Sequence, residues 1–343
     1  MSDLALAVII PVLNEAEALP ELLADLCAQR EVMLEVMICD GGSRDGTREL
    51  AEKTPHTLVS SPPGRGRQMN AGVQRSRARW LLFLHADSRL TDPHQLVDAL
   101  QMIQSIHRHE PRVAGHFPIQ FSDVDAQTRT RLALQQAKSH LNRQQVIHGD
   151  QGLLIHRDFL NKLGGFDELM PFLEDQRLSE LIFANGRWLT LPGQLSTSAR
   201  RFAQEGVTQR HLLNIIIMAA FTLQLEHFFT QAKALYQQQA DTEKLQLSPF
   251  IILFKQSVEQ SGSWWQLGRY LGQNLWQLAL AIDVHRGGTE PPYGVLARFD
   301  RWFTPWLDRP PLQPFWTATA WFATQSLHHY FRWKERPHEP PRR

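Results

Sequence analysis

The stretch AVIIPVLNEAEALPELLADL, residues 7–26, decides the fold of the first part of the chain. Its first half extends an apolar run, Leu4–Leu13, that is rich in Val and Ile, as expected of a strand covered on both faces. Its second half carries apolar residues at helical spacing, at Leu19, Leu22, Leu23 and Leu26. Pro20 fits the first turn of that helix. A buried strand followed directly by a helix predicts a βα unit of a parallel sheet.

The same alternation continues through the next 80 or so residues, as expected for repeated βα units. Further strands are expected at Glu35–Cys39, His56–Ser60 and Trp80–Leu84. Helices are expected through Leu50, over Gln68–Arg77 and over Pro93–His107. The chain is therefore predicted to be an α/β protein with a Rossmann-like, mostly parallel sheet.

The pattern changes after residue 112. Val113–Phe121 alternates in polarity and predicts one half-buried strand, which Pro118 places near a sheet edge. A helix is expected over Ala126–Asn142, with short strands at Leu153–Ile155 and Trp188–Leu191. This part is expected to complete the sheet.

The last third of the chain is rich in tryptophan and predicted to be mainly helical. Eight of the ten Trp residues follow position 260, and apolar spacing predicts helices over Leu212–Phe229 and Trp264–Ile282. We interpret the aromatics as the core of a helical subdomain: Trp264, Trp265, Tyr270, Trp276, Phe299, Trp302, Trp306, Trp316 and Trp321. The alternative is an aromatic surface for an acceptor or a membrane.

Three regions follow from these patterns. Residues 1–235 form the predicted sheet domain, and residues 236–331 form a helical Trp-rich extension. Residues 332–343 form a basic, Pro-rich tail, which we expect to be disordered.

Charge and composition exclude several classes of protein. The 343 residues carry 36 Lys plus Arg and 35 Asp plus Glu, a net charge of +1, so no global field favours nucleic acid. Two cysteines in apolar segments, Cys27 and Cys39, argue against a disulfide framework. The N-terminal residues do not have the pattern of a signal peptide, so none is expected, and no apolar run of about 20 residues occurs in the sequence. We expect a cytoplasmic protein, with peripheral contact at the inner face of a membrane as a further hypothesis.

Polar clusters follow each of the four predicted parallel strands. They are Asn14-Glu15, Asp40 with its Gly-rich turn, Arg65–Asn70 and His85-Ala86-Asp87. Ligands of open α/β sheets bind beyond the carboxyl ends of the strands, so these clusters are expected on one rim.

The first clusters have a functional and a structural interpretation. Asp40 is suited to accept hydrogen bonds from a base or ribose, although it could also cap a turn. Ser43 or Asp45 is expected to cap the helix through Leu50. Arg65 and Arg67 are expected in a Pro/Gly loop that binds a diphosphate or is simply solvated.

The remaining clusters suggest a cation and a base. Asp87, at the end of a buried strand, is suited to a hard divalent cation, with His85 as a second ligand or a packed histidine. Glu174 and Asp175 open a predicted helix, where acids complement the helix dipole or supply a general base. Adjacent helical side chains point about 100° apart, so one at most faces the reacting atom.

Seven motifs occur in order: AVIIPVLNEAEALPELLADL, CDGGSRDGT, GRGRQMNAG, LLFLHAD, GDQGLLIHRD, LGGFDE and LEDQRLS. Together they resemble the family 2 glycosyltransferases over about residues 5–230. The resemblance implies the GT-A fold and inverting transfer of a sugar from a nucleotide-diphosphate sugar to an acceptor hydroxyl.

The resemblance also implies roles for residues at matching positions. The nucleotide would be bound by Pro11, Asn14, Glu15, Asp40, Arg65, Gln68, Asn70 and Asp87. Asp87 would hold Mg²⁺ or Mn²⁺ against the diphosphate. Gly149 and Asp150 would lie by the acceptor, and Asp175, beside Glu174, would be the catalytic base. A UDP-sugar is the favoured donor and a GDP-sugar the other option; the acceptor is not identified.

Two motifs depart from the family pattern. The Asp-x-Asp sequence is His85-Ala86-Asp87 here, so one carboxylate is certain instead of two. The Gln-x-x-Arg-Trp motif is missing, which argues against a processive synthase, although Arg200 or Arg201 could serve the diphosphate. A non-catalytic sugar-nucleotide binding protein therefore stays open, as does, more remotely, a sugar nucleotidyltransferase.

Overall fold

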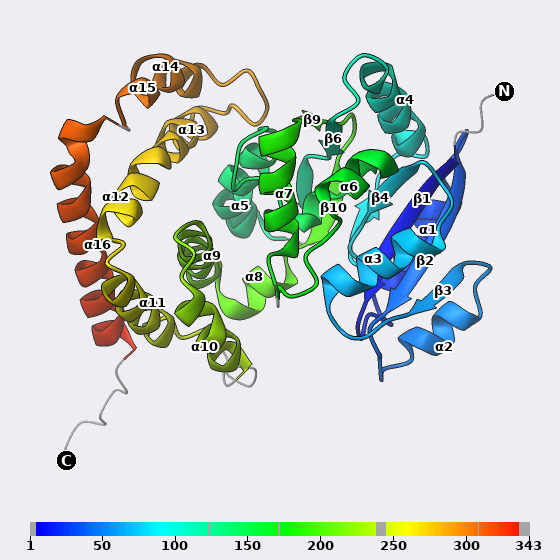
Figure 1. The fold of residues 1–343 in the computed structure, drawn as a ribbon, viewed down its shortest axis with the longest axis horizontal. Helices are drawn as coiled ribbons and strands as arrows, with labels where there is room; N and C mark the ends of the chain where they lie inside the picture. The colour runs from blue at the N-terminus through cyan, green and yellow to red at the C-terminus, as the bar shows by residue number, and fades with distance from the viewer. Residues whose placement is uncertain (1–4, 123, 171, 238–244, 308, 336–343) are drawn as a thin grey trace. The chain divides into compact units, whose positions relative to one another are not determined.

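The computed structural model describes residues 5–122, 124–170, 172–237, 245–307 and 309–335 (Figure 1). The chain divides into two compact units. The first, here called the sheet unit, comprises residues 1–124 and 135–198, and the second, the helical unit, comprises residues 125–134 and 199–343. The prediction of a boundary at residue 235 concerned the extent of the family domain and stays a prediction.

The sheet unit is built on a seven-stranded, mostly parallel sheet, which confirms the predicted α/β class. Its strand order is β3-β2-β1-β4-β8-β6-β9. The strands are β1 (Ala5–Val12), β2 (Met33–Asp40), β3 (Thr57–Ser60), β4 (Trp80–Phe83), β6 (Val113–His116), β8 (Leu153–His156) and β9 (Arg187–Thr190). Among these, only β8 runs antiparallel to its neighbours, β4 and β6. A smaller sheet has the order β5-β10-β7, with β5 (Arg89–Leu90), β7 (Ile119–Ser122) and β10 (Leu195–Ser198).

Strand β1 is buried because helices cover both faces of the sheet. Its even-numbered residues pack with helices α1 (Leu19–Cys27), α2 (Thr47–Glu52) and α4 (Gln95–His107). Its Ala7 and Ile9 pack instead with α3 (Arg65–Arg75), α6 (Arg157–Leu163) and α7 (Glu174–Asn185). Two separate cores therefore lie on the two faces, as the uninterrupted apolar run of β1 requires.

Strand order also creates a switch point in the sheet. The chain moves from β1 outward through β2 to β3 and then returns to the other side of β1 as β4. In open α/β sheets the crevice at such a reversal is the usual ligand site. The carboxyl ends of β1 and β4 are therefore the place where bound ligand is expected.

Three local expectations are corrected. Val113–Phe121 is not one strand: it breaks after His116, and its halves, β6 and β7, belong to different sheets. Pro118 stands in the break, where a missing N–H costs no ladder hydrogen bond. Arg65 and Arg67 lie in the first turn of α3 and not in a loop. Helix α2 begins after Gly46, although the Asp45 carboxylate does accept the Thr47 N–H at 3.1 Å.

The helical unit carries the remaining helices. They are α8 (Arg200–Glu205), α9 (Val207–Thr222), α10 (Glu226–Gln237), α11 (Ser248–Ser261), α12 (Trp264–Gln273), α13 (Trp276–His285), α14 (Gly294–Trp302), α15 (Thr304–Leu307) and α16 (Gln313–Lys334). Helix α5 (Ala126–Ser139) begins in this unit and ends in the sheet unit. Short 3-10 turns occur at η1 (Gly149–Gln151) and η2 (Pro310–Leu312).

Helices α12 and α16 approach closely inside the helical unit. A Cβ placed on Gly268 would lie 2.1 Å from the Trp316 carbonyl oxygen, and one on Gly272 would lie 2.9 Å from the Trp316 ring. Glycine at both positions therefore lets the two backbones meet. Trp316 is buried there and donates its Nε1–H to the Leu307 carbonyl at 3.1 Å.

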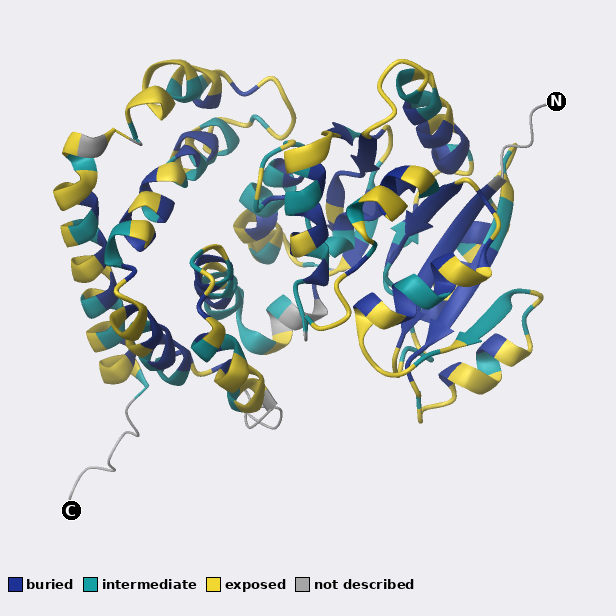
Figure 2. Cartoon of the chain, in the orientation of Figure 1, coloured by how far each residue is buried: buried dark blue, intermediate teal, exposed yellow. Residues whose placement is uncertain are grey.

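The tryptophan-rich core prediction is correct only in part. Tyr270, Trp276 and Trp316 are buried, whereas Trp302, Trp306 and Trp321 are exposed. Of the exposed three, only Trp321 lies on α16, a helix that Figure 2 shows with exposed residues in yellow along one side and buried residues in dark blue along the other.

The first three residues of the predicted disordered tail are helical. Residues 332–334 form the last turn of α16, because the first proline able to stop that helix is Pro337. Residues 336–343 lie outside the described residues. Both cysteines are free, Cys39 buried and Cys27 exposed. Within the described ranges, no helix combines the length and the apolar content needed to cross a membrane.

Candidate functional site

The strand register brings the predicted polar clusters to one edge of the sheet. Val12 pairs with Asp40, and Asp40 pairs with Ser60, so the first three strands end together. Ile9 pairs with Phe83, which in turn pairs with Leu153 at the start of the antiparallel β8. The turn before β8 therefore joins the carboxyl ends of the parallel strands at this edge.

The loops after β1 and β2 are tied to each other. The Asn14 N–H donates to Ser43 Oγ at 2.9 Å, and Asn14 Oδ1 accepts the Arg44 N–H at 2.8 Å. The Glu15 N–H donates to Thr47 Oγ1 at 2.8 Å. Asn14 adopts a left-handed backbone conformation, with φ of 59°. These bonds hold the Asn14 turn against the Gly-rich turn, with Pro11 buried beneath them in β1.

Asp40 and Gln68 are buried at the base of these loops. Asp40 closes β2, and its Oδ1 accepts the Ser43 N–H at 3.0 Å. Gln68 Nε2 donates to the Val12 carbonyl at 2.8 Å and to the Cys39 carbonyl at 2.7 Å. Gln68 thus fastens the ends of β1 and β2, a positioning contact that sequence spacing does not reveal.

Asn70 fastens the Gly-Gly-Phe-Asp-Glu turn to α3. Its Nδ2 donates to the Phe166 carbonyl and to Glu168 Oε1, both at 2.9 Å, and its Oδ1 accepts the Phe166 N–H at 3.0 Å. Phe166 is thereby held edge-on to Phe83, with ring centroids 4.9 Å apart. Like Gln68, Asn70 makes contacts that shape the site.

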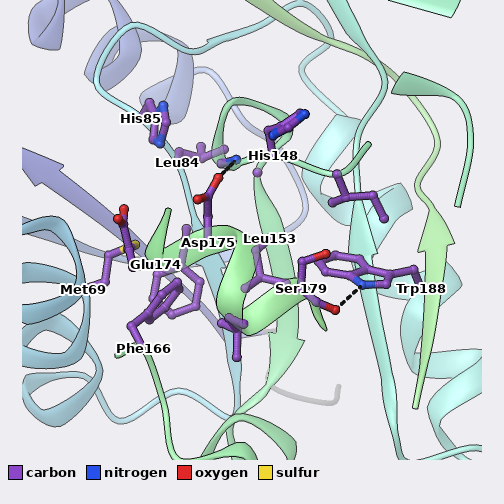
Figure 3. Close-up of a pocket in the computed structure, with 15 residues that line it drawn as sticks. Met69, Leu84, His85, His148, Leu153, Phe166, Glu174, Asp175, Ser179 and Trp188 are labelled. Atoms are coloured by element: carbon purple, nitrogen blue, oxygen red, sulfur yellow. Dashed lines mark hydrogen bonds between the residues drawn. The ribbon is translucent and has the colours of Figure 1, made fainter. Parts of the chain in front are cut away.

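A pocket lies where β4, the turn before β8 and the start of α7 meet (Figure 3). The Gly149 N–H donates to Asp175 Oδ2 at 2.7 Å. A Cβ on Gly149 would lie 2.8 Å from His85 Nε2 and 3.3 Å from Asp175 Oδ2. The structure therefore brings His85, Gly149 and Asp175 together, and only glycine leaves room between the other two.

Glu174 occupies a different environment from its neighbour. Its side chain is only 3% exposed, and Arg65 Nη1 lies 3.7 Å from its Oε1. Burial raises the pKa of Glu174, while the positive charge of Arg65 opposes that rise. Asp175 is less buried than Glu174. The adjacent acids are thus separated into a buried, paired Glu174 and an accessible Asp175.

Asp150 adds a further acidic group. Its Oδ1 is buried and has no hydrogen-bond partner among the described residues. Burial raises the pKa of Asp150, and the negative charges of Asp175 and Asp87 raise it further, while His148 opposes them. Three carboxylates therefore lie close enough to interact, which concentrates negative charge beside the pocket.

We tested whether these side chains alone could hold a metal. In the described part of the chain, no group of three or more His, Cys, Asp or Glu residues is arranged to hold one. A magnesium ion, however, is commonly held by one or two carboxylates together with substrate phosphates. The unpartnered Asp150 oxygen near Asp87 fits that second arrangement, in which the ligand completes the ion's shell.

Part of the site was not apparent in the sequence. The pocket has an apolar floor of Met69, Phe83, Leu153, Phe166, Leu178 and Trp188. Ser179 lines it too, one helical turn after Asp175, and that spacing could have identified it. His148 also lines it and is held by Gln176 at 2.9 Å. Arg200 and Arg201 begin α8, but their side chains lie outside the described residues.

A ligand site at the carboxyl edge of an open, mostly parallel sheet defines the general class of the sheet unit. Residues 7–165 match the model of the family described as Glycosyl transferase family 2. That match confirms, over this segment, the resemblance based on the seven sequence motifs.

Curated relatives match about a third of the chain. Glycosyltransferase AglJ of Haloferax volcanii is 32% identical over 130 residues, which cover 37% of this chain and 40% of that protein. The PGL/p-HBAD biosynthesis glycosyltransferase Rv2957 of Mycobacterium tuberculosis is 33% identical over 112 residues, which cover 31% and 43%. The chain thus spans less than half the length of these relatives.

Solved structures resemble a larger part of the chain more distantly. Mannosyltransferase PcManGT from Pyrobaculum calidifontis, in complex with GDP-Man and Mn²⁺, is 19% identical with a TM-score of 0.46, covering 95% of this chain and 87% of its own. TarS 1–349 of S. aureus, in complex with UDP, is 14% identical with a TM-score of 0.48, covering 95% and 91%. Likeness at this level carries no functional assignment.

Proposed function

We propose that this protein is an inverting glycosyltransferase that moves a sugar from a nucleotide-diphosphate sugar to an acceptor hydroxyl. The observation that carries the proposal is the Asp175 carboxylate, held by the Gly149 N–H at 2.7 Å at the edge where the parallel strands end. This edge belongs largely to the segment that matches the glycosyltransferase family.

Asp175 is the proposed general base. A base must reach the hydroxyl whose proton it takes, and Asp175 lines the pocket while remaining less buried than Glu174. Its bond from Gly149 orients the carboxylate and leaves lone pairs for a substrate. Glu174, paired with Arg65, is proposed to hold the start of α7 in place.

The proposed reaction is a single displacement. Asp175 removes the acceptor hydroxyl proton as the acceptor oxygen forms a bond to the anomeric carbon. The bond from that carbon to the diphosphate oxygen breaks, and the diphosphate leaves with the electron pair. Attack opposite the leaving group inverts the anomeric centre.

Asp87 is the proposed protein ligand of Mg²⁺ or Mn²⁺, with Asp150 and His85 beside it. When bound, a divalent cation would neutralise charge on the departing diphosphate. Asp40 is proposed to accept hydrogen bonds from the donor's base or ribose, with Pro11, Asn14 and Glu15 lining the same pocket. A UDP-sugar is the favoured donor.

The first experiment is a thermal-shift panel. UDP, GDP, CDP and ADP are each tested with EDTA, Mg²⁺ or Mn²⁺, because a ligand that binds only the folded state raises its Tm. One nucleotide is expected to raise Tm in a metal-dependent way. Sugars on that nucleotide are then screened for slow hydrolysis, the reaction of a transferase whose acceptor is missing.

Asp87→Ala and Asp92→Ala make a matched pair for this panel. Asp92 is an exposed carboxylate a few residues further along, whose Oδ1 accepts the His94 N–H. The shift is expected to vanish in the Asp87 variant and persist in the other. Absence of any shift in the unmodified protein, or an equal shift in both variants, would reject the nucleotide–metal assignment.

A further inference from the structure

Helix α16 packs in the helical unit with one side and exposes large aromatic side chains on another. Phe315 is 59% exposed, Phe322 63% and Trp333 70%, and Tyr330 is exposed as well. These four residues are here called the aromatic face. Large apolar groups exposed together on one element indicate an interaction surface.

The spacing of these residues places them on one side of the helix. Phe315, Phe322 and Trp333 recur at intervals of seven and eleven, which return to nearly the same direction at 100° per residue. The buried Ala320, Thr324 and Phe331 lie on the opposite side, toward the rest of the unit. Phe315, Phe322 and Trp333 therefore lie along one line of the helix, directed away from the unit's core, and Tyr330 lies about 60° to one side of that line.

Cations border the aromatic face at both ends. Helix α16 contains no Asp or Glu and ends with Arg332 and Lys334 in its last turn. Lys334 Nζ lies 5.5 Å from the Tyr330 ring centroid. Near the start of the helix, the Arg309 guanidinium lies 3.5 Å from the ring centroid of Trp306, which is also exposed. Aromatic rings beside long cationic side chains suit the boundary between lipid headgroups and acyl chains.

We infer that the aromatic face docks on the surface of an anionic lipid bilayer. The rings enter the headgroup layer, and Arg309, Arg332 and Lys334 meet the negative lipid charge. The Leu212–Phe229 segment, predicted as one helix, is divided between α9 and α10. The inference concerns binding alone and stands whether or not the proposed transferase activity is correct.

The same charges argue against a second copy of the chain as the occupant. Two-fold pairing brings one patch against itself. Basic side chains lie near both ends of α16, which itself has no acid, and the carboxylate of Glu335 just beyond it already accepts the Leu247 and Ser248 N–H groups. Pairing in either direction would therefore place like charges together. Anionic lipid provides the missing negative charge.

The test is co-sedimentation of the full-length protein with vesicles. Phosphatidylcholine vesicles are compared with vesicles that also contain phosphatidylserine, at low and high salt. Binding is expected to the anionic vesicles and to weaken with salt, because screening shortens the reach of surface charge. Phe322→Gln/Trp333→Gln is expected to lower the partition coefficient about tenfold or more, since two interfacial rings are lost.

A matched control removes equally exposed apolar groups elsewhere. Met33 is 65% exposed and Leu278 64% exposed, and Met33→Gln/Leu278→Gln is expected to bind like the unmodified protein. Arg332→Glu/Lys334→Glu is expected to lose about tenfold at low salt and much less at high salt. Circular dichroism verifies that each variant is folded.

Three results would overturn the inference. The first is no sedimentation of the unmodified protein with anionic vesicles. The second is equal loss in the aromatic-face and control variants. The third is a dimer, detected by analytical ultracentrifugation, that Phe322→Gln/Trp333→Gln abolishes, because that result would assign the face to a second copy.

Discussion

The two units of this protein differ in which side chains have an unusual environment: acids are buried in the sheet unit, and aromatic rings are exposed in the helical unit. In the sheet unit, apolar groups fill both faces of β1, and the unusual groups are buried or half-buried acids at one edge. In the helical unit, the unusual groups are large aromatics left in solvent. An unpaired buried charge and a group of exposed aromatic rings both raise the free energy of the folded protein. Each therefore indicates a site where a binding partner makes the missing contacts.

The difference follows from the architecture of each unit. A sheet covered on both faces has its loops at its edges, so polar chemistry gathers where strands end. A helix that packs on one side only keeps a free face along its whole length. From this comparison we propose that the sheet unit binds a small ligand and the helical unit an extended surface. The following predictions test that division.

The largest expected effect is on catalysis in the sheet unit. Asp175→Asn removes the proposed base and is expected to lower kcat by about 10³-fold, within the usual range for a general base. Turnover of the donor identified by the thermal-shift panel is the measurement. Glu180→Gln changes an acid on the same helix that pairs with Arg177 and is expected to leave kcat unchanged. Equal kcat values for the two variants would show that Asp175 is not the general base.

The next effect depends on the space beside Asp175. Gly149→Ala places a Cβ 2.8 Å from His85 Nε2, so the turn must shift, and kcat/KM is expected to fall about 10²-fold. Gly294→Ala is the control, because its nearest neighbour would be the end of Arg298 at 3.9 Å. Full activity of Gly149→Ala would mean that the turn adapts and that its position is not critical.

A smaller effect is expected on the stability of the helical unit. Gly268→Ala forces a Cβ to within 2.1 Å of the Trp316 carbonyl, and separating α12 from α16 is expected to cost about 1–3 kcal/mol. Calorimetry is expected to show earlier unfolding of this unit, while nucleotide binding by the sheet unit is retained. Loss of both together would show that the units do not behave separately.

The smallest effect is the pH-dependent stability at Asp150. The pKa of Asp150 is raised in the folded protein, so the folded state binds the proton more tightly than the unfolded state. The free energy of unfolding therefore falls as pH rises from 3.8, the ordinary pKa, through the raised pKa. Asp150→Asn removes this loss and is expected to raise Tm by a few degrees at pH 7. That gain is expected to shrink toward zero as pH falls below 3.8. A gain independent of pH would point to packing instead of charge.

Much of the sheet unit could be predicted because its signals are local. The apolar run of β1 and the helical spacing at Leu19–Cys27 both report burial of single elements. The site residues could be nominated since all parallel strands of one sheet end at the same edge. The break at Pro118 was missed because polarity alternates equally in one strand or two.

Contacts between segments far apart in the sequence could not be predicted from such local patterns. Nothing near Gln68 in the chain indicates that its amide bonds the Val12 and Cys39 carbonyls, and nothing near Glu174 indicates its pairing with Arg65. The tryptophans illustrate the same limit. Their composition predicts burial equally for Trp316 and Trp321, yet only the first lies where α12 covers it.

Periodicity within the chain is therefore enough to define the α/β class and the first βα units, and with them the edge where the polar clusters after the parallel strands lie. The separation of Glu174 from Asp175, the space kept open at Gly149 and the outward aromatic face of α16 arise only when the elements pack. The physical reason is that periodicity reports which side of an element is apolar. Exposure and charge environment depend on which other element covers that side, and long-range packing decides this.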